Sequence, residues 1–257
     1  MISTPTFAIF VALAVFAGGA VGLVLQRALP EGLTTGGPRD MIGAVVGLLT
    51  LLSALVLGLL IWTAYGVYAN QNLAIQTLAA KVLQFDLALS DYGPETKDLR
   101  LQLRDGLGKT IDELWGEQVS NANFVAENFS AALKNLRARQ AALDKLHPTT
   151  DEQTRALAAA SAAADSIAQS RLAMSFALSA PISLPLVETV VGWAVLIFIG
   201  YGLMSKGNPM SIVVAIVGAL AIASAFHMIL DLSQPYTGVF RVSSAPLEQV
   251  LAVMGKE

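Results

Sequence analysis

The segment MIGAVVGLLTLLSALVLGLLIWTAYGVYANQNLAIQTLAA, which runs from Met41 to Ala80, contains no charged side chain. A helix needs only about 20 apolar residues to cross a hydrocarbon core of about 30 Å. The uncharged segment is therefore longer than one membrane crossing. Trp62, Tyr65 and Tyr68 lie where the aromatic belt of a membrane boundary is expected. The pattern predicts a membrane-spanning helix that continues beyond the bilayer.

The composition of the whole chain is that of a membrane protein. Of its 257 residues, 54% are hydrophobic and only 14% are charged, whereas about a quarter of the residues in a typical soluble domain are charged. We therefore expect an all-α protein with four transmembrane helices. The stretches that are apolar and long enough are Thr6–Gln26, Met41–Val67, Ile182–Met204 and Met210–Leu230.

The region between the second and third apolar stretches has a different character. Leu99, Leu103, Leu107, Ile111 and Leu114 recur at helical spacing between charged residues. This spacing is typical of an amphipathic helix that buries one face. We expect that helix to belong to a helical bundle outside the membrane.

Short signals mark helix ends in the same region. Gly93 can terminate one helix, and Pro94 suits the first turn of the next. A further helix is expected over about 123–146. The sequence TTDEQ at 149–153 contains two overlapping capping boxes, each a threonine with Glu or Gln three residues later, and either one predicts a helix start.

These signals divide the chain into four parts. We expect two transmembrane helices, an extramembrane helical bundle, two more transmembrane helices, and a C-terminal extended segment with a short amphipathic helix. The bundle and both chain ends should lie on one side of the membrane. The respective ranges are 1–68, 69–180, 181–232 and 233–257.

Glycines spaced by four residues indicate where helices pack closely. Gly18 and Gly22 in the first transmembrane helix, and Gly43 and Gly47 in the second, form faces that allow close backbone approach. Ionisable groups in the apolar stretches would also be difficult to satisfy in a single four-helix unit. We therefore expect a homo-oligomer.

Several function classes are disfavoured by the residues that the chain lacks. It has no cysteine, which excludes disulfides, thiolate nucleophiles and cysteine-ligated metals. His147 and His227 are its only histidines, so a histidine-rich metal site is impossible. No Ser-His-Asp spacing, phosphate-binding loop or basic patch interleaved with aromatics is present. We expect no enzymatic activity, no cofactor and no nucleic-acid partner.

Three ionisable residues in the apolar stretches are candidates for a pore or an ion site. Glu188 lies near the start of the third transmembrane helix, and His227 and Asp231 lie one helical turn apart near the end of the fourth. An ionised side chain deep in hydrocarbon costs at least about 2.5–3.5 kcal/mol, so none of them should face lipid.

Each candidate also has a purely structural explanation. Glu188 would be favoured by the helix dipole if its helix begins close to it. Asp231 would accept hydrogen bonds from the following turn or pair with Arg241. His227 would be neutral and hydrogen-bonded within the helix bundle. The sequence leaves both interpretations open for all three residues.

Four stretches in the same order resemble one protein family. They are RDMIGAVVGLLTLLSALVLGLL at 39–60, DYGPETKDLRLQLR at 91–104, LPLVETVVGWAVLIFIGYGL at 184–203 and ILDLSQPYTGVFRVSSAPLEQVL at 229–251. Together they resemble the bacterial bestrophin-like membrane proteins, most of which have no known function. The resemblance covers essentially the whole chain from Arg39 onward.

The resemblance implies kinship to bestrophins, which are oligomeric anion channels with four transmembrane helices and a mostly cytosolic helical body. It implies a multi-pass protein of the bacterial inner membrane, an inorganic ion as the transported partner and a cytoplasmic location for 69–180. The count of Lys and Arg near the helix ends is nearly balanced between the two sides. The matching residues with expected structural or interface roles are Arg39, Asp40, Trp193, Pro235, Gly238 and Arg241.

Two functions therefore remain open at the level of the sequence. One is an ion channel in which rings of ionisable side chains select the ion. Acidic rings built from Glu188 or Asp231 would favour cations, whereas kinship to bestrophins indicates anions. The other is a non-conducting membrane scaffold or sensor whose helical bundle binds a protein partner.

Overall fold

A computed structural model describes residues 4–30, 36–115, 134, 136–178, 183–205, 208–236 and 238–254. Within these ranges every regular element is a helix, and no strand occurs. The chain forms two compact units. The membrane unit comprises Met1–Gly66 and Pro181–Ser233, and the bundle comprises Val67–Ala180 and Gln234–Glu257.

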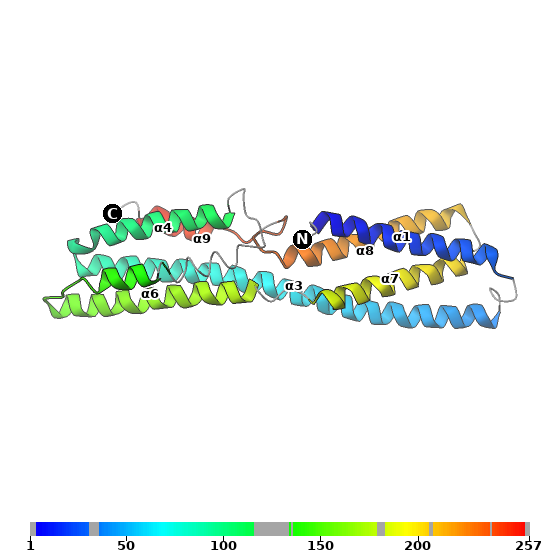
Figure 1. Ribbon diagram of the computed structural model, residues 1–257, viewed down its shortest axis with the longest axis horizontal. Coiled ribbons are helices and arrows are strands. Elements are labelled where there is room, and N and C mark those ends of the chain that lie inside the picture. Colours follow the sequence, from blue (N-terminus) through cyan, green and yellow to red (C-terminus); the bar gives the residue numbers. More distant parts are fainter. Residues whose placement is uncertain are drawn as a thin grey trace. The chain divides into compact units, whose positions relative to one another are not determined.

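Four helices are long and apolar enough to cross a membrane (Figure 1). This confirms the prediction of an all-helical membrane protein with four membrane-spanning helices. The second of them continues without a break from the membrane unit into the bundle. The four helices are α1 (Thr4–Ala28), α3 (Gly37–Tyr92), α7 (Leu184–Met204) and α8 (Pro209–Leu232).

Helix α1 packs along both α7 and α8, and the direct contact between α7 and α8 is small. The buried glycines of α1 make this approach possible. A Cβ atom on Gly18 would lie 2.9 Å from the carbonyl oxygen of Val195, and one on Gly22 would collide with the carbonyl oxygen of Ile199. The predicted Gly18–Gly22 face therefore packs against α7 of the same chain.

The glycine face of α3, formed by Gly43 and Gly47, makes fewer close contacts than that of α1. A Cβ on Gly43 would come within 3.3 Å of the methyl group of Met204, whereas one on Gly47 would meet no described atom within 4 Å. The closest fit between α3 and α7 is instead at Gly200, which receives the side chain of Val46. The predicted contact of Gly47 is thus not made among the described residues.

Large apolar side chains cover much of the outside of the membrane unit. Such a surface would be a liability in water, but it is what a helix presents to lipid. The exposed residues of α3 and α8 include Leu48, Leu51, Leu55, Leu59, Ile212, Val213, Ile216, Val217 and Leu220.

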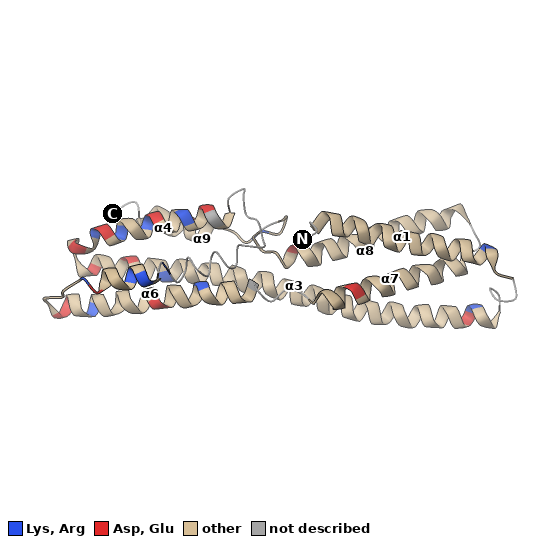
Figure 2. Cartoon of the chain, in the orientation of Figure 1, with Lys and Arg blue, Asp and Glu red and all other residues tan. Residues whose placement is uncertain are grey.

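The bundle has its own hydrophobic core, built by the second half of α3 together with α4 (Lys97–Trp115), α6 (Asp151–Leu178) and α9 (Ala245–Met254). Charged residues gather on this part of the chain and are sparse on α1, α7 and α8 (Figure 2). The predicted amphipathic face is confirmed, because all five of its residues lie in or against this core. They are Leu99, Leu103, Leu107, Ile111 and Leu114.

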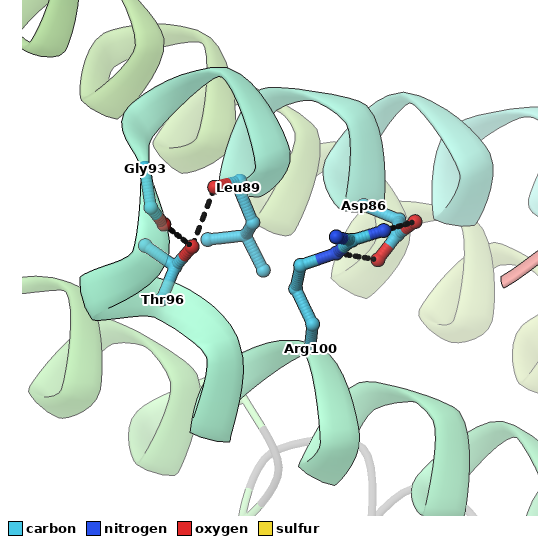
Figure 3. Close-up of polar contacts among 5 residues, drawn as sticks. All are labelled: Asp86, Leu89, Gly93, Thr96 and Arg100. Atoms are coloured by element: carbon cyan, nitrogen blue, oxygen red, sulfur yellow. Dashed lines mark hydrogen bonds and ion pairs between the residues drawn. The ribbon is translucent and has the colours of Figure 1, made fainter. Parts of the chain in front are cut away.

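The corner between α3 and α4 forms as the sequence predicts. Gly93 ends α3 with φ 126°, a conformation that favours glycine, and Pro94 begins the short 3₁₀ helix η1 (Pro94–Thr96). The buried hydroxyl of Thr96 lies 2.5 Å from the carbonyl oxygen of Leu89 and 2.8 Å from that of Gly93 (Figure 3). This hydroxyl therefore fastens η1 to the last turn of α3.

A bidentate ion pair fixes the same corner from the α4 side. Arg100 donates from Nε to Oδ1 of Asp86 at 2.9 Å and from Nη2 to Oδ2 at 3.0 Å (Figure 3). Asp86 is only 3% exposed, so its charge would be costly without this partner. The pair specifies the orientation of α4 against α3.

Two further predicted features concern the segment before α6. The helix expected over 123–146 lies partly outside the described residues, although 136–143 is helical and Leu143 is in the bundle core. Of the two capping boxes, the structure forms one half of the second, because the side chain of Gln153 accepts from Thr149 and not from the backbone N–H of Thr150. Thr150 Oγ1 accepts a hydrogen bond from the backbone N–H of Gln153 at 3.1 Å.

Candidate functional site

The three ionisable candidates lie toward one end of the membrane unit. Helices α7 and α8 are consecutive and joined by a short connection, so the start of α7 and the end of α8 lie at the same end. We call this the junction end, because the chain passes there between the two units. Glu188 is about 6 Å along α7 from its first residue, and His227 is about 8 Å from the last residue of α8.

Asp231 is buried in the folded chain. It lies in the last turn of α8 and is only 2% exposed. Ser233 closes the helix after it, because its backbone N–H donates to the carbonyl oxygen of Ile229 at 3.2 Å and its hydroxyl donates to that of Leu230 at 2.6 Å. Asp231 therefore faces neither lipid nor the outer surface of the single chain.

His227 lies one turn deeper on α8 and is half-buried. Its Nδ1 atom is inaccessible to solvent and has no hydrogen-bond partner among the described residues. The neighbouring Phe226 and Ile229 are fully buried. A buried polar atom without a partner costs about 1–3 kcal/mol. One interpretation of the sequence was that His227 is hydrogen-bonded within the helix bundle, and no such hydrogen bond forms at Nδ1 among the described residues.

Glu188 differs from the other two because it is exposed. Helix α7 begins at Leu184 with Ser183 at its N-cap, so Glu188 falls beyond the first turn. The helix dipole acts mainly within the first turn. Helix α7 therefore begins near Glu188 as expected, but this carboxylate lies just beyond the first turn, where the helix dipole acts most strongly.

The exposed face of α7 carries more than the carboxylate. Leu184, Glu188, Gly192 and Leu196 follow each other at intervals of four residues and are all exposed, so they line one face of the helix. Thr189 lies beside Glu188 and is also exposed. The opposite face, which includes Val187, Val190, Ala194 and Ile197, is buried.

Exposed ionisable side chains are few in the described part of the membrane unit. They are Arg27, Asp40 and Glu188. Arg27 ends α1 and Asp40 begins α3, so these two lie at the end of the unit opposite the junction. Glu188 is thus the exposed charge at the junction end of the described part of the membrane unit.

Arg39 and Asp40 both lie at the end opposite the junction end, but Arg39 is half-buried and Asp40 is exposed. Arg39 Nη2 donates to the carbonyl oxygen of Met204 at 3.3 Å, at the C-terminus of α7. A cation at this position is favoured by the helix dipole. Arg39 therefore links α3 to α7, whereas the side chain of Asp40 is exposed in the first turn of α3.

The C-terminal segment is fixed by a buried polar cluster within the bundle. Tyr236 donates from its hydroxyl to Oε1 of Gln71 at 2.8 Å, and Gln71 donates from Nε2 to the carbonyl oxygen of Met174 at 3.2 Å. The indole N–H of Trp115 donates to the carbonyl oxygen of Val242 at 2.7 Å. Burial raises the pKa of Tyr236 well above its usual range, so its phenol remains a donor.

The remaining signature residues lie near this cluster or on α7. Pro235 is buried, and its carbonyl oxygen accepts from the backbone N–H of Val242 at 2.8 Å. Gly238 has φ 85°, which favours glycine. Arg241 is exposed, and Trp193 on α7 is half-buried.

Gln71, Trp115 and Tyr236 were not predicted from the sequence to interact. Gln71 is one of several uncharged polar residues that follow Tyr68, and nothing in the local pattern distinguishes it. Its partner is separated from it by 165 positions. The sequence feature that could have indicated Tyr236 is its position in 229–251, the stretch that resembles the bestrophin-like proteins and also contains Pro235 and Gly238.

A family model described as Bestrophin-like domain matches residues 13–247. The matched range begins within α1 and ends within α9. No curated protein and no solved structure matches the chain.

Proposed function

Because the chain belongs to the bestrophin-like family, we propose that it forms a homo-oligomeric ion channel in which the Glu188 face of α7 lines the conducting path. Kinship to bestrophins supports both an oligomer and conduction. The four membrane-spanning helices match the number expected from that kinship. The proposal also places the protein in the bacterial inner membrane, with the bundle in the cytoplasm.

The observation that carries the proposal is the exposure of Glu188 on an apolar helix. A charged carboxylate within the hydrocarbon region costs several kcal/mol when it faces lipid. Glu188 lies on the outer surface of the single chain, about 6 Å from the start of α7, so lipid headgroups, water or another copy of the chain must surround it. A water-filled path at the centre of an oligomer satisfies this requirement for every copy at once.

The other exposed residues on this face suit a conducting path. Thr189 is a small polar residue beside the carboxylate, and Gly192, one turn deeper, leaves space for water. The exposed faces of α3 and α8, by contrast, are dominated by large aliphatic residues. Helix α7 is therefore the helix best suited to face the axis of an oligomer.

The sign of the exposed charge predicts the permeant ion. A ring of glutamates favours cations, and Asp231 adds no exposed charge of its own because it is buried. We therefore propose conduction of cations, although kinship to the bestrophins alone would indicate anions. The exposed carboxylate of Glu188 supports the cation.

Ion flux into liposomes tests the proposal. Purified protein in liposomes should release K⁺ down its gradient faster than empty vesicles, and Glu188→Gln should reduce this release several-fold. Glu152→Gln is a matched control, because Glu152 is an exposed acid on α6 in the bundle. Absence of flux, or equal flux in the Glu188→Gln variant and the wild type, would contradict the channel.

Labelling in intact cells tests the orientation. The chain has no cysteine, so single cysteines can be placed at the exposed positions Asp40 and Glu152. A membrane-impermeant thiol reagent should label the cysteine at Asp40 only. Labelling at Glu152 only would place the bundle outside the cell without changing the fold.

One observation favours the alternative of a non-conducting scaffold. The bundle exposes several large apolar side chains, Leu73, Leu87, Leu101 and Phe176, which a protein partner could cover. If no flux occurs across K⁺, Na⁺, Cl⁻ and H⁺ gradients, and the bundle retains a specific partner that is lost in Leu101→Ser and Phe176→Ser, the scaffold replaces the channel.

A further inference from the structure

The segment after α8 forms a closed loop. The backbone N–H of Val242 donates to the carbonyl oxygen of Pro235 at 2.8 Å, which joins the two ends of the loop. Gly238 turns the chain with φ 85°. We call residues 238–241 the apex of this loop.

Both ends of the loop are fixed in the bundle. Tyr236 is held by Gln71 at 2.8 Å, and the carbonyl oxygen of Val242 is held by the indole of Trp115 at 2.7 Å. The rings of Trp115 and Tyr236 also meet edge to face, with centroids 5.6 Å apart. These anchors keep the apex in a defined place.

The apex is apolar and exposed. Val239 is 79% exposed and Phe240 is 44% exposed. Arg241 follows directly and is exposed as well. Two bulky apolar residues beside one cation suit a segment at a membrane surface. There the apolar residues contact acyl chains, and the cation contacts lipid phosphate.

Helix α3 shows how close the loop is to the membrane boundary. Trp62 and Tyr65 are exposed on this helix, as expected for an aromatic belt. Gln71, which anchors Tyr236, follows Tyr68 by three residues, and this is about 4.5 Å of helical rise. The fixed end of the loop is therefore attached to α3 less than one turn beyond the last aromatic residue of the belt.

The connection to α8 sets a second limit. Val239 follows Leu232, the last residue of α8, by seven positions. Seven residues span at most about 25 Å when fully extended. This connection therefore limits the distance from the end of α8 to Val239 to about 25 Å.

We propose that the apex inserts into the headgroup region of this bilayer, with Val239 and Phe240 against the upper acyl chains and Arg241 at the lipid phosphates. A second copy of the chain is a weaker candidate for the occupant, because a stable protein interface buries about 800 Å² on each partner. Two apolar side chains do not supply that area. This insertion is independent of whether the protein conducts ions.

Depth-dependent fluorescence quenching tests this insertion. Val239→Cys in the full chain is labelled with an environment-sensitive dye and reconstituted in nanodiscs. Lipids that carry a nitroxide near the headgroup should quench the dye several-fold more strongly than aqueous iodide does, and the emission should shift to the blue. Leu101→Cys on α4 is the matched control, since Leu101 is 50% exposed and should show strong iodide quenching with no shift.

Two results would overturn the proposal. Water-like emission and strong iodide quenching at position 239, equal to those at position 101, would show that the apex is in solvent. Disulfide-linked dimers of Val239→Cys without lipid quenching would show that a second copy covers the apex. Phe240→Cys repeats the measurement from the neighbouring position, and far-ultraviolet circular dichroism checks that each variant is folded.

Discussion

Replacing Gly22 by alanine should weaken the contact between α1 and α7 sharply. The new Cβ would collide with the carbonyl oxygen of Ile199 and would lie 2.9 Å from Cα of Gly202. Both obstacles are backbone atoms, so they cannot rotate away, and the two helices must separate. Overpacking of this kind costs about 1–3 kcal/mol. The loss exceeds the gain in helix propensity from glycine to alanine, which is about 1 kcal/mol in an exposed helix.

Gly58→Ala is the matched control for this prediction. A Cβ at Gly58 meets no described atom within 4 Å, so only the gain in helix propensity applies. Unfolding in mixed micelles with increasing denaturing detergent, followed by circular dichroism, should show Gly22→Ala unfolding earlier than the wild type and Gly58→Ala unfolding no earlier. Equal midpoints for the two variants would refute the tight contact between α1 and α7.

Two predictions concern the bundle. Asp86→Asn should destabilise it by about 1.5–3 kcal/mol, because the neutral amide can accept only one of the two charge-assisted hydrogen bonds that Arg100 donates to the carboxylate; a double-mutant cycle with Arg100→Met measures the coupling and should show that the losses are not additive. Tyr236→Phe removes the donor to the buried oxygen of Gln71 and should cost about 1–3 kcal/mol. Burial raises the pKa of Tyr236, so this stabilisation is complete below the ordinary tyrosine pKa of about 10 and declines above it. Stability measured against pH should therefore decline less steeply above that value in Tyr236→Phe, and identical profiles would contradict the buried phenol.

The positions of the membrane helices follow closely from the sequence because a bilayer imposes a length and excludes charge. The uncharged run from Met41 to Ala80 predicted that one helix would leave the membrane, and α3 does so. Gly93 and Pro94 marked its end for conformational reasons that are local to those residues. Each of these predictions needs only neighbouring residues along the chain.

Which helices pack against each other cannot be predicted from neighbouring residues in this way. A membrane helix is apolar on every side, so its sequence does not distinguish the face toward protein from the face toward lipid. Gly18 and Gly22 indicated that α1 packs closely, but not that α7 is its partner. Gly47 carries the same motif on α3 and makes no close contact among the described residues.

The candidate site shows the same limit. Composition identified Glu188, His227 and Asp231 equally well, since each is ionisable in an apolar stretch. Their burial differs because it depends on how α7 and α8 pack against α1. Only the folded chain shows that Asp231 is enclosed while Glu188 is exposed, and this difference makes Glu188 the stronger candidate for the path of an ion.

The reversal potential of the purified protein in a planar bilayer tests the proposed channel most directly. Under a KCl gradient, a path lined by Glu188 should give a zero-current potential close to the equilibrium potential of K⁺. Glu188→Gln should move this potential toward zero, whereas Glu152→Gln in the bundle should leave it unchanged. A wild-type potential close to the equilibrium potential of Cl⁻, or one that Glu188→Gln does not move, would contradict the assignment of Glu188 to the conducting path.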